Sequence, residues 1–212
     1  MHSFLGIVLL LLILAPECHG RSEEQHQTHG KSSRLSVKFA DIQLVSISVS
    51  NGGKWGNWAD IKMCPRGSFA KGFSLKVEAD QGDGDDTAVN GIRLKCISPL
   101  KPSEVDYVES GSQRWGSWTT MQECGHGGLS AFQLRVEEPQ GHADDTSLNN
   151  IRFLCGDGAA LEGHGLTRGS WGPWSPTCVS GGICGLWTRV ESWQIKGDDT
   201  ALNDVKFVCC PN

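Results

Sequence analysis

One block of residues occurs three times in this chain, with the same amino acids in the same order. Each copy has a Trp-Gly-x-Trp segment, a cysteine, an Asp-Asp-Thr segment, an asparagine and a second cysteine, and the first tryptophan stands at positions 55, 115 and 171. Such a repeat, with its cysteines in phase, predicts a three-fold structure closed on itself.

The N-terminus has the features of a signal peptide. Phe4 to Leu14 is an unbroken apolar run, too short to span a bilayer. Cys18 and Gly20 are small residues ahead of a cut, which places cleavage after Gly20 and makes 1–20 the signal peptide. No second apolar run of membrane length follows, so we expect a secreted, extracellular protein without membrane insertion.

The charge of the chain excludes some classes of partner. Its formal net charge is −5, and no basic patch indicates nucleic acid or an anionic membrane. Residues 21–34 are polar and without apolar periodicity, which predicts a disordered leader.

The cysteines predict four disulfide bonds. Cleavage removes Cys18 and leaves eight of the nine cysteines in an oxidising compartment. Equivalent positions should be bridged alike, which gives Cys64–Cys96, Cys124–Cys155 and Cys178–Cys209. Cys184 and Cys210 then pair by elimination, and the swap of Cys178–Cys210 with Cys184–Cys209 stays open.

The apolar residues alternate with a period of two, which is typical of strands. Phe73, Leu75 and Val77 alternate with polar residues, and the second copy repeats this pattern. The last strand of each copy ends in a cysteine, and these strands are Ile92–Cys96, Ile151–Cys155 and Val205–Cys209. Earlier strands are predicted at Leu44–Val49, Val105–Glu109 and Leu161–Thr167.

The predicted fold class is all-β. Three small sheets that face one another around an axis bury all three apolar faces, which is a β-prism with internal three-fold pseudo-symmetry; an up-and-down barrel or a sandwich is the alternative. Residues 35–212 are expected to form this single domain, with repeats at about 35–100, 101–158 and 159–212.

These motifs resemble the vitelline membrane outer layer protein I family. The likeness rests on the three Trp-Gly-x-Trp segments, the three Asp-Asp-Thr-x-x-Asn segments and the final Cys209-Cys210 pair, and it covers roughly residues 40 to 211. It implies a β-prism of three Greek-key sheets, secretion and four disulfides. It also implies a place among proteins of the outer layer of the egg vitelline membrane, with a tendency toward chito-oligosaccharides and a weak transferase-like character.

The six motif tryptophans are candidate ligand-binding residues, because the apolar face of a sugar stacks on an exposed indole. The alternative is a packing corner, with each ring lying on glycine backbone. Trp187 and Trp193 occur in the third copy alone, which favours a local surface role for them. The six candidates are Trp55, Trp58, Trp115, Trp118, Trp171 and Trp174.

The Asp-Asp-Thr segments hold the only clustered carboxylates, which makes them further candidates for ligand binding. Paired carboxylates can act on a glycosidic bond or bind calcium, but the spacing fits no EF-hand loop. Asp and Thr side chains also fix turns by bonding nearby backbone, which is the structural alternative. These residues are Asp85, Asp86, Asp144, Asp145, Asp198 and Asp199.

The sequence carries no positive sign of catalysis, and no cofactor or metal site is expected. It lacks the G-x-S-x-G and H-E-x-x-H motifs. Two functional classes remain. The first is a secreted structural or barrier protein, a monomer, that binds oligosaccharides or extracellular matrix glycoproteins. The alternative is a carbohydrate-active enzyme acting on N-acetylglucosamine oligosaccharides.

Overall fold

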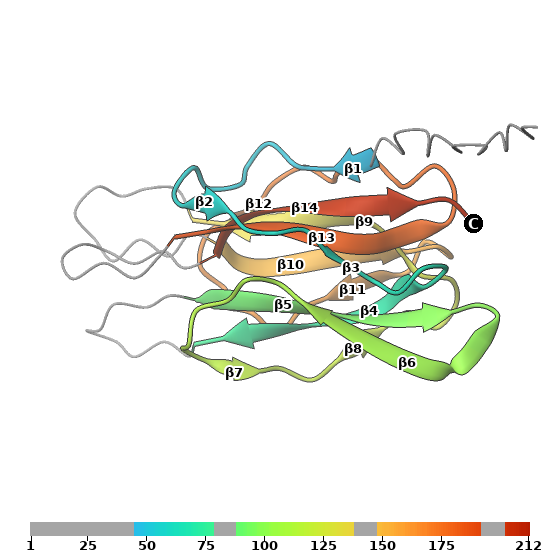
Figure 1. Cartoon of the computed structure of the whole chain (residues 1–212). Helices are drawn as coiled ribbons and strands as arrows, with labels where there is room; N and C mark the ends of the chain where they lie inside the picture. Colours follow the sequence, from blue (N-terminus) through green and yellow to red (C-terminus); the bar gives the residue numbers. More distant parts are fainter. Residues whose placement is uncertain (1–44, 79–87, 138–147, 192–201) are drawn as a thin grey trace, which may run out of the picture. The chain divides into compact units, whose positions relative to one another are not determined.

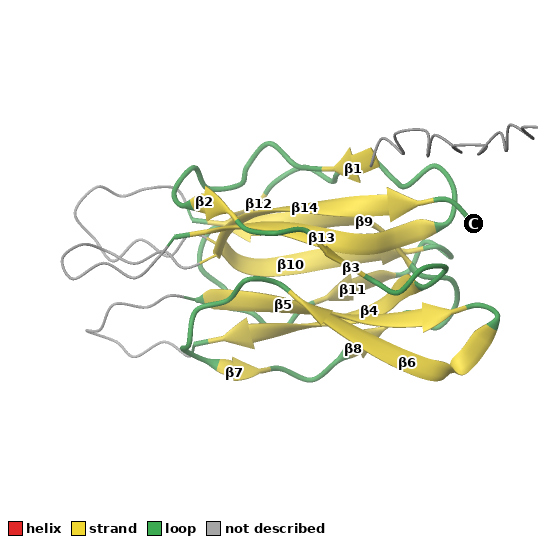
Figure 2. Ribbon diagram, in the orientation of Figure 1, coloured by secondary structure: helices red, strands yellow, loops and turns green. Residues whose placement is uncertain are grey.

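The computed structural model describes residues 45–78, 88–137, 148–191 and 202–212. Asp41–Asn212 forms one compact unit. Its described residues form strands, turns and loops, without a helix (Figure 2). The strands are β1 (Val45–Ile47), β2 (Asn57–Trp58), β3 (Lys62–Met63), β4 (Phe69–Val77), β5 (Val89–Ser98), β6 (Lys101–Glu109), β7 (Ser117–Trp118), β8 (Gln122–Glu123), β9 (Leu129–Val136), β10 (Leu148–Cys155), β11 (Ala160–Glu162), β12 (Ser170–Trp171), β13 (Gly182–Val190) and β14 (Leu202–Cys210).

The strands form three antiparallel sheets, and the fold is a β-prism. The first sheet has the order β6-β5-β4-β7, with β8 also on β4; the second is β11-β10-β9-β12; the third is β1-β14-β13-β2, with β3 also on β13. In the first two sheets the last strand returns beside the first long one, which is Greek-key connectivity.

The sheets are offset from the sequence repeats. The tryptophan strand β7 of the second repeat pairs with β4 of the first, and β12 of the third pairs with β9 of the second. The third sheet is completed by β1, β2 and β3 from the start of the described chain, beside β13 and β14 at its end (Figure 1). This exchange of short strands closes the ring and ties its two ends together.

Two predicted strands are shorter than expected. Within Leu44–Val49 the structure has β1 at Val45–Ile47, and the second is the strand predicted at Leu161–Thr167. Leu161–Thr167 contains only the end of β11, because the backbone after Glu162 runs directly over the core. A Cβ on Gly163 would lie 2.7 Å from Leu75 Cδ1 and 3.1 Å from Phe73 Cε2. This close approach leaves no room for a side chain and ends the regular strand.

Four phenylalanines form the centre of the core. Phe153 of β10 lies 4.6 Å from Phe73 of the first sheet and 5.0 Å from Phe207 of the third, between ring centroids. Phe132, its neighbour in the second sheet, lies 4.8 Å from Phe207. All four are fully buried, so the three sheets share one apolar core.

The disulfides join equivalent positions in the three copies. The structure contains Cys64–Cys96, Cys124–Cys155 and Cys178–Cys209, and the fourth bridge is Cys184–Cys210. These are the pairs that equivalence and elimination predict, and the swapped pairing is not formed. Each of the first three bridges joins the segment before one long strand (β4, β9 or β13) to the last residues of the long strand that follows it (β5, β10 or β14).

Candidate functional site

Three of the six motif tryptophans lie beneath a cation on a long strand of the same sheet. The guanidinium of Arg93 lies 4.1 Å from the ring centroid of Trp118, and that of Arg152 lies 4.2 Å from Trp171. In the third sheet Lys206 Nζ lies 4.6 Å from the Trp58 ring. The three cations hold the same position on β5, β10 and β14, directly after a buried Ile or Val. Each contact contributes about 0.5–1 kcal/mol at a partly exposed site, so these indoles stabilise the sheets.

The third copy of the tryptophan motif has a different register from the one its letters indicate. Ser170–Trp171 pairs with β9 as Ser117–Trp118 pairs with β4 and as Asn57–Trp58 pairs with β13. Trp171 therefore takes the place of the second tryptophan of the other copies. The match of Trp171-Gly172-Pro173-Trp174 with the other two segments is wrong at the level of structure.

A left-handed glycine explains this register. Gly56, Gly116 and Gly169 have φ of 79°, 80° and 72°, a region that favours glycine. A Cβ on any of them would collide with the carbonyl of a valine, which is Val190, Val77 or Val136. The structural motif is therefore Gly-x-Trp, and its signal in the sequence is the Gly-Ser-Trp shared by 116–118 and 169–171.

The other three tryptophans are exposed. The exposed fractions are 62% for Trp55, 45% for Trp115 and 38% for Trp174. Trp55 and Trp115 directly precede the corner glycines, and Arg168 holds that position in the third copy. Arg114 lies 5.7 Å from the Trp115 ring, whereas no ring or cation of the described residues contacts Trp55. These are flat apolar faces open to solvent.

The six candidate aspartates fall in 79–87, 138–147 and 192–201, outside the described residues, as does Trp193. The asparagine after each Asp-Asp-Thr segment is described and fully buried. The backbone carbonyl of each asparagine accepts a hydrogen bond from a backbone N–H in the segment before a tryptophan motif. The donors are Gln113 for Asn90, Leu166 for Asn149 and Gly53 for Asn203. The asparagines Asn90, Asn149 and Asn203 are therefore structural.

Asp204 follows the last of these asparagines and is a half-buried carboxyl. Burial raises its pKa above 3.8, although the Val205 N–H, Lys206 and Arg189 act in the opposite direction. Its Oδ1 accepts the Val205 N–H at 2.8 Å, and Asn150 Oδ1 accepts the Ile151 N–H at the equivalent position, also at 2.8 Å. An amide can therefore make the same hydrogen bond without a buried charge.

We expect Asp204→Asn to stabilise the protein at neutral pH. Because the folded pKa is raised, the folded state holds its proton more tightly than the unfolded state, and stability falls as pH rises through this window. Above this pH window Asp204 is ionised in the folded protein, and the full free-energy cost of burying its charge is present. The variant should gain about 2 to 4 °C in Tm per 1 kcal/mol relieved, and lose this advantage in acid. Thermal unfolding across pH measures this, with Asn150→Asp as the reverse control; equal melting of Asp204→Asn and the parent at neutral pH would contradict it.

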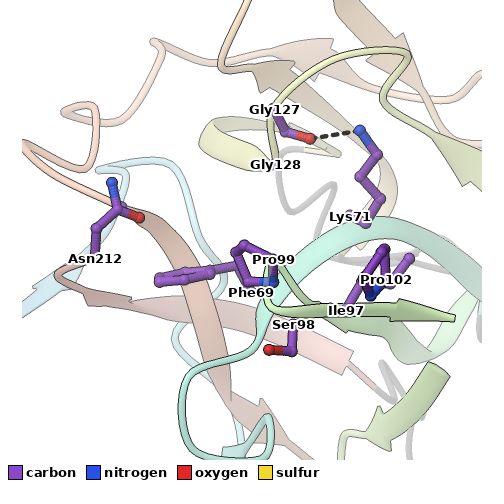
Figure 3. Close-up of a pocket in the computed structure, with 10 residues that line it drawn as sticks. Phe69, Lys71, Ile97, Ser98, Pro99, Pro102, Gly127, Gly128 and Asn212 are labelled. Atoms are coloured by element: carbon purple, nitrogen blue, oxygen red, sulfur yellow. Dashed lines mark hydrogen bonds between the residues drawn. The ribbon is translucent and has the colours of Figure 1, made fainter. Parts of the chain in front are cut away.

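A pocket lies at the other end of the prism. It has a volume of 410 Å³ and apolar walls that include Phe69, Pro99 and Pro102. Lys71 reaches from its side to the carbonyl of Gly127 at 2.7 Å (Figure 3). Phe69 begins β4, whereas Trp115 and its corner glycine lie at the Val77 end of that strand. The pocket and these exposed indoles therefore belong to two separate surfaces.

Within the described residues no three His, Cys, Asp or Glu side chains gather as metal ligands. The same part of the chain contains no helix that is long and apolar enough to cross a membrane.

Comparison with known families agrees with this architecture. The family model for vitelline membrane outer layer protein I matches residues 45–212. The chain belongs to this family. The vitelline membrane outer layer protein 1 homolog of Homo sapiens is 51% identical over 186 residues, 87% of each chain. The homolog of Mus musculus is 46% identical over 203 residues, 95% of each chain. Family membership and four disulfides indicate an extracellular protein.

Two lectins share the fold of this family member. Frutapin, from Artocarpus incisa, aligns with a TM-score of 0.51 at 12% identity, covering 79% of this chain and 98% of its own. The Calsepa lectin, solved in complex with a biantennary N-glycan, aligns with a TM-score of 0.50 at 15% identity, covering 76% of this chain and 93% of its own. At this identity the likeness establishes the fold alone.

Proposed function

We propose that this protein is a secreted, disulfide-stabilised structural protein of an extracellular barrier that binds neutral glycans through Trp55 and Trp115. The signal peptide at 1–20 would direct its secretion, and residues 35–212 would act as a monomeric binding domain. The observation that carries the proposal is the separation of the tryptophans into two groups. Three are held beneath cations on the long strands of their own sheets, whereas Trp55 and Trp115 are exposed at equivalent corners, with only the adjacent Arg114 near the Trp115 ring.

Exposed indoles at fixed corners are suited to sugar binding. A tryptophan has a large rigid surface and few rotatable bonds, so it loses little entropy when a ligand stacks on it. The corner glycines Gly56 and Gly116 fix the backbone beside each ring. Exposing an indole costs hydrophobic free energy in the unbound protein, and stacking against the apolar face of a sugar recovers part of it.

The family and the fold support this function. The matched family is that of an outer layer protein of the vitelline membrane, and the two lectins above are glycan-binding by name. Four disulfides stabilise a chain exposed to extracellular conditions.

We expect Trp55→Ala to weaken binding of N-acetylglucosamine oligosaccharides about tenfold, since an aromatic contact contributes up to roughly 1.5 kcal/mol. Isothermal titration of the mature protein measures this change. Trp174→Ala is the matched control, because Trp174 is exposed but has no equivalent in the other copies. Unchanged affinity of Trp55→Ala and Trp115→Ala, or an equal loss in Trp174→Ala, would contradict the assignment.

A further inference from the structure

The outer face of the third sheet carries a cluster that the other two sheets lack. Trp58 and Trp187 lie 5.0 Å apart between ring centroids, and Lys206 Nζ lies 4.6 Å from one ring and 5.3 Å from the other. Trp187 is paired with Lys206 across β13 and β14. We call these three residues the Lys206 cluster.

The equivalent sites in the other sheets are complete stacks of carboxylate, cation and indole. Glu109 on β6 forms an ion pair with Arg93 at 2.7 Å, and Arg93 lies over Trp118. Glu162 on β11 forms an ion pair with Arg152 at 2.6 Å, and Arg152 lies over Trp171. In both sheets the carboxylate comes from the strand beside the cation.

The described strands of the third sheet have no carboxylate at this position. β1 is the strand beside β14, with Ile47 opposite Phe207. Continuing this antiparallel register by one residue brings Ser48, which is exposed, opposite Lys206. Ser48 thus stands where the other sheets have Glu109 and Glu162. Among the described residues, none forms an ion pair with Lys206.

The charges that face Lys206 leave it able to bind an anion. Asp204 lies on the same face of β14, and the charge of Lys206 lowers the pKa of its half-buried carboxyl against the larger effect of burial. Its Oδ1 accepts the Val205 N–H, and it forms no ion pair with Lys206 within the described chain. Arg189, opposite Asp204 on β13, adds a second cation and donates from Nε to the carbonyl of Gly56. An ammonium has three donors, and no hydrogen bond of the described residues uses those of Lys206.

Trp187 adds apolar surface where the other sheets have small or polar groups. Ser74 and Gln133 hold its position opposite Arg93 and Arg152. Two adjoining indoles next to an ammonium suit a ligand with an apolar ring face and a carboxylate. Acidic sugars such as uronic and sialic acids have both groups.

We propose that the Lys206 cluster is a binding site for a carboxylate-bearing saccharide. The ligand's carboxylate takes the place that Glu109 and Glu162 fill in the other sheets, and its ring packs on Trp58 and Trp187. That the ligand is a saccharide rests on the proposed function. That it bears a carboxylate rests on the third sheet alone, where Ser48 stands in place of Glu109 and Glu162. This site is built from residues other than Trp55 and Trp115.

The test uses two tetrasaccharides and the whole mature protein. One probe alternates glucuronic acid with N-acetylglucosamine, and the other is made of N-acetylglucosamine alone. Lys206→Met keeps an unbranched stem over the indoles. We expect this variant to bind the acidic probe about tenfold more weakly than the parent and to bind the neutral probe with unchanged affinity. Lys206→Arg should retain acidic binding, which should also weaken as salt is raised.

Ser48→Glu is the decisive variant. It supplies from β1 the carboxylate that Glu109 and Glu162 provide in the other sheets, so it should compete with the acidic probe and reduce its binding while the protein keeps or gains thermal stability. Arg152→Met is the matched control in the second sheet and should leave acidic binding unchanged.

Each outcome decides the proposal. Failure of the parent protein to bind the acidic probe, equal binding by Lys206→Met, or full binding by Ser48→Glu would overturn it. Loss of neutral binding in Trp55→Ala with acidic binding retained separates the two sites, so the proposed function and this inference can fail independently.

Discussion

Replacing Phe153 by alanine should lower the free energy of unfolding by about 3–5 kcal/mol. Phe153 is fully buried and contacts Phe73, Phe132 and Phe207, so its ring joins all three sheets. Its removal opens a cavity that no single sheet can close alone. Equilibrium unfolding in guanidinium chloride measures the loss.

Two controls accompany Phe153→Ala. Phe153→Leu should cost much less, because Leu94 fills the equivalent position of the first sheet and is itself fully buried. Val179→Ala, at a fully exposed side chain, should leave stability within about 0.5 kcal/mol. A loss below about 1 kcal/mol for Phe153→Ala would show that the sheets do not share one core.

The disulfides should differ in their contribution to stability. Cys124–Cys155 closes a segment with a sequence separation of 31, for which the chain-entropy model gives about 3.7 kcal/mol. Cys184–Cys210 has a sequence separation of 26, but Cys178–Cys209 already joins the two segments of chain in which Cys184 and Cys210 lie. The added loop is therefore short, roughly 8 residues, and the same model gives about 2.5 kcal/mol.

Double cysteine-to-serine variants test this order. Thermal and denaturant unfolding should show a larger loss for Cys124/Cys155 than for Cys184/Cys210. The opposite order would mean that strain or native contacts, rather than loop closure, dominate the contribution of these bridges.

Much of the fold was predictable because the repeat reports on equivalent positions. The alternation of Phe73, Leu75 and Val77 fixed which residues face the core, and the in-phase cysteines restricted the pairings. The exchange of short strands between neighbouring sheets was not predictable. A repeat in sequence has the same period whether its tryptophan strand pairs within its own copy or with the preceding one.

The candidate site was only partly predictable. Identical letters do not distinguish Trp118, covered by Arg93, from Trp115, which is exposed. The third copy misled because Trp171-Gly172-Pro173-Trp174 repeats the letters of the motif, while the left-handed glycine is Gly169. The occurrence of Trp187 in the third copy alone favours a local surface role, which stays a prediction, and the position of Lys206 opposite Trp187 could be found only from the strand register.

The most direct test of this account is a titration of the mature parent protein with N-acetylglucosamine oligosaccharides, followed by product analysis after long incubation. Tryptophan fluorescence should change saturably, and mass spectrometry should recover the oligosaccharide unaltered. That result is expected of a binding protein whose exposed indoles take up the sugar. Multiple-turnover cleavage or transfer of the oligosaccharide, or no saturable binding at all, would contradict it.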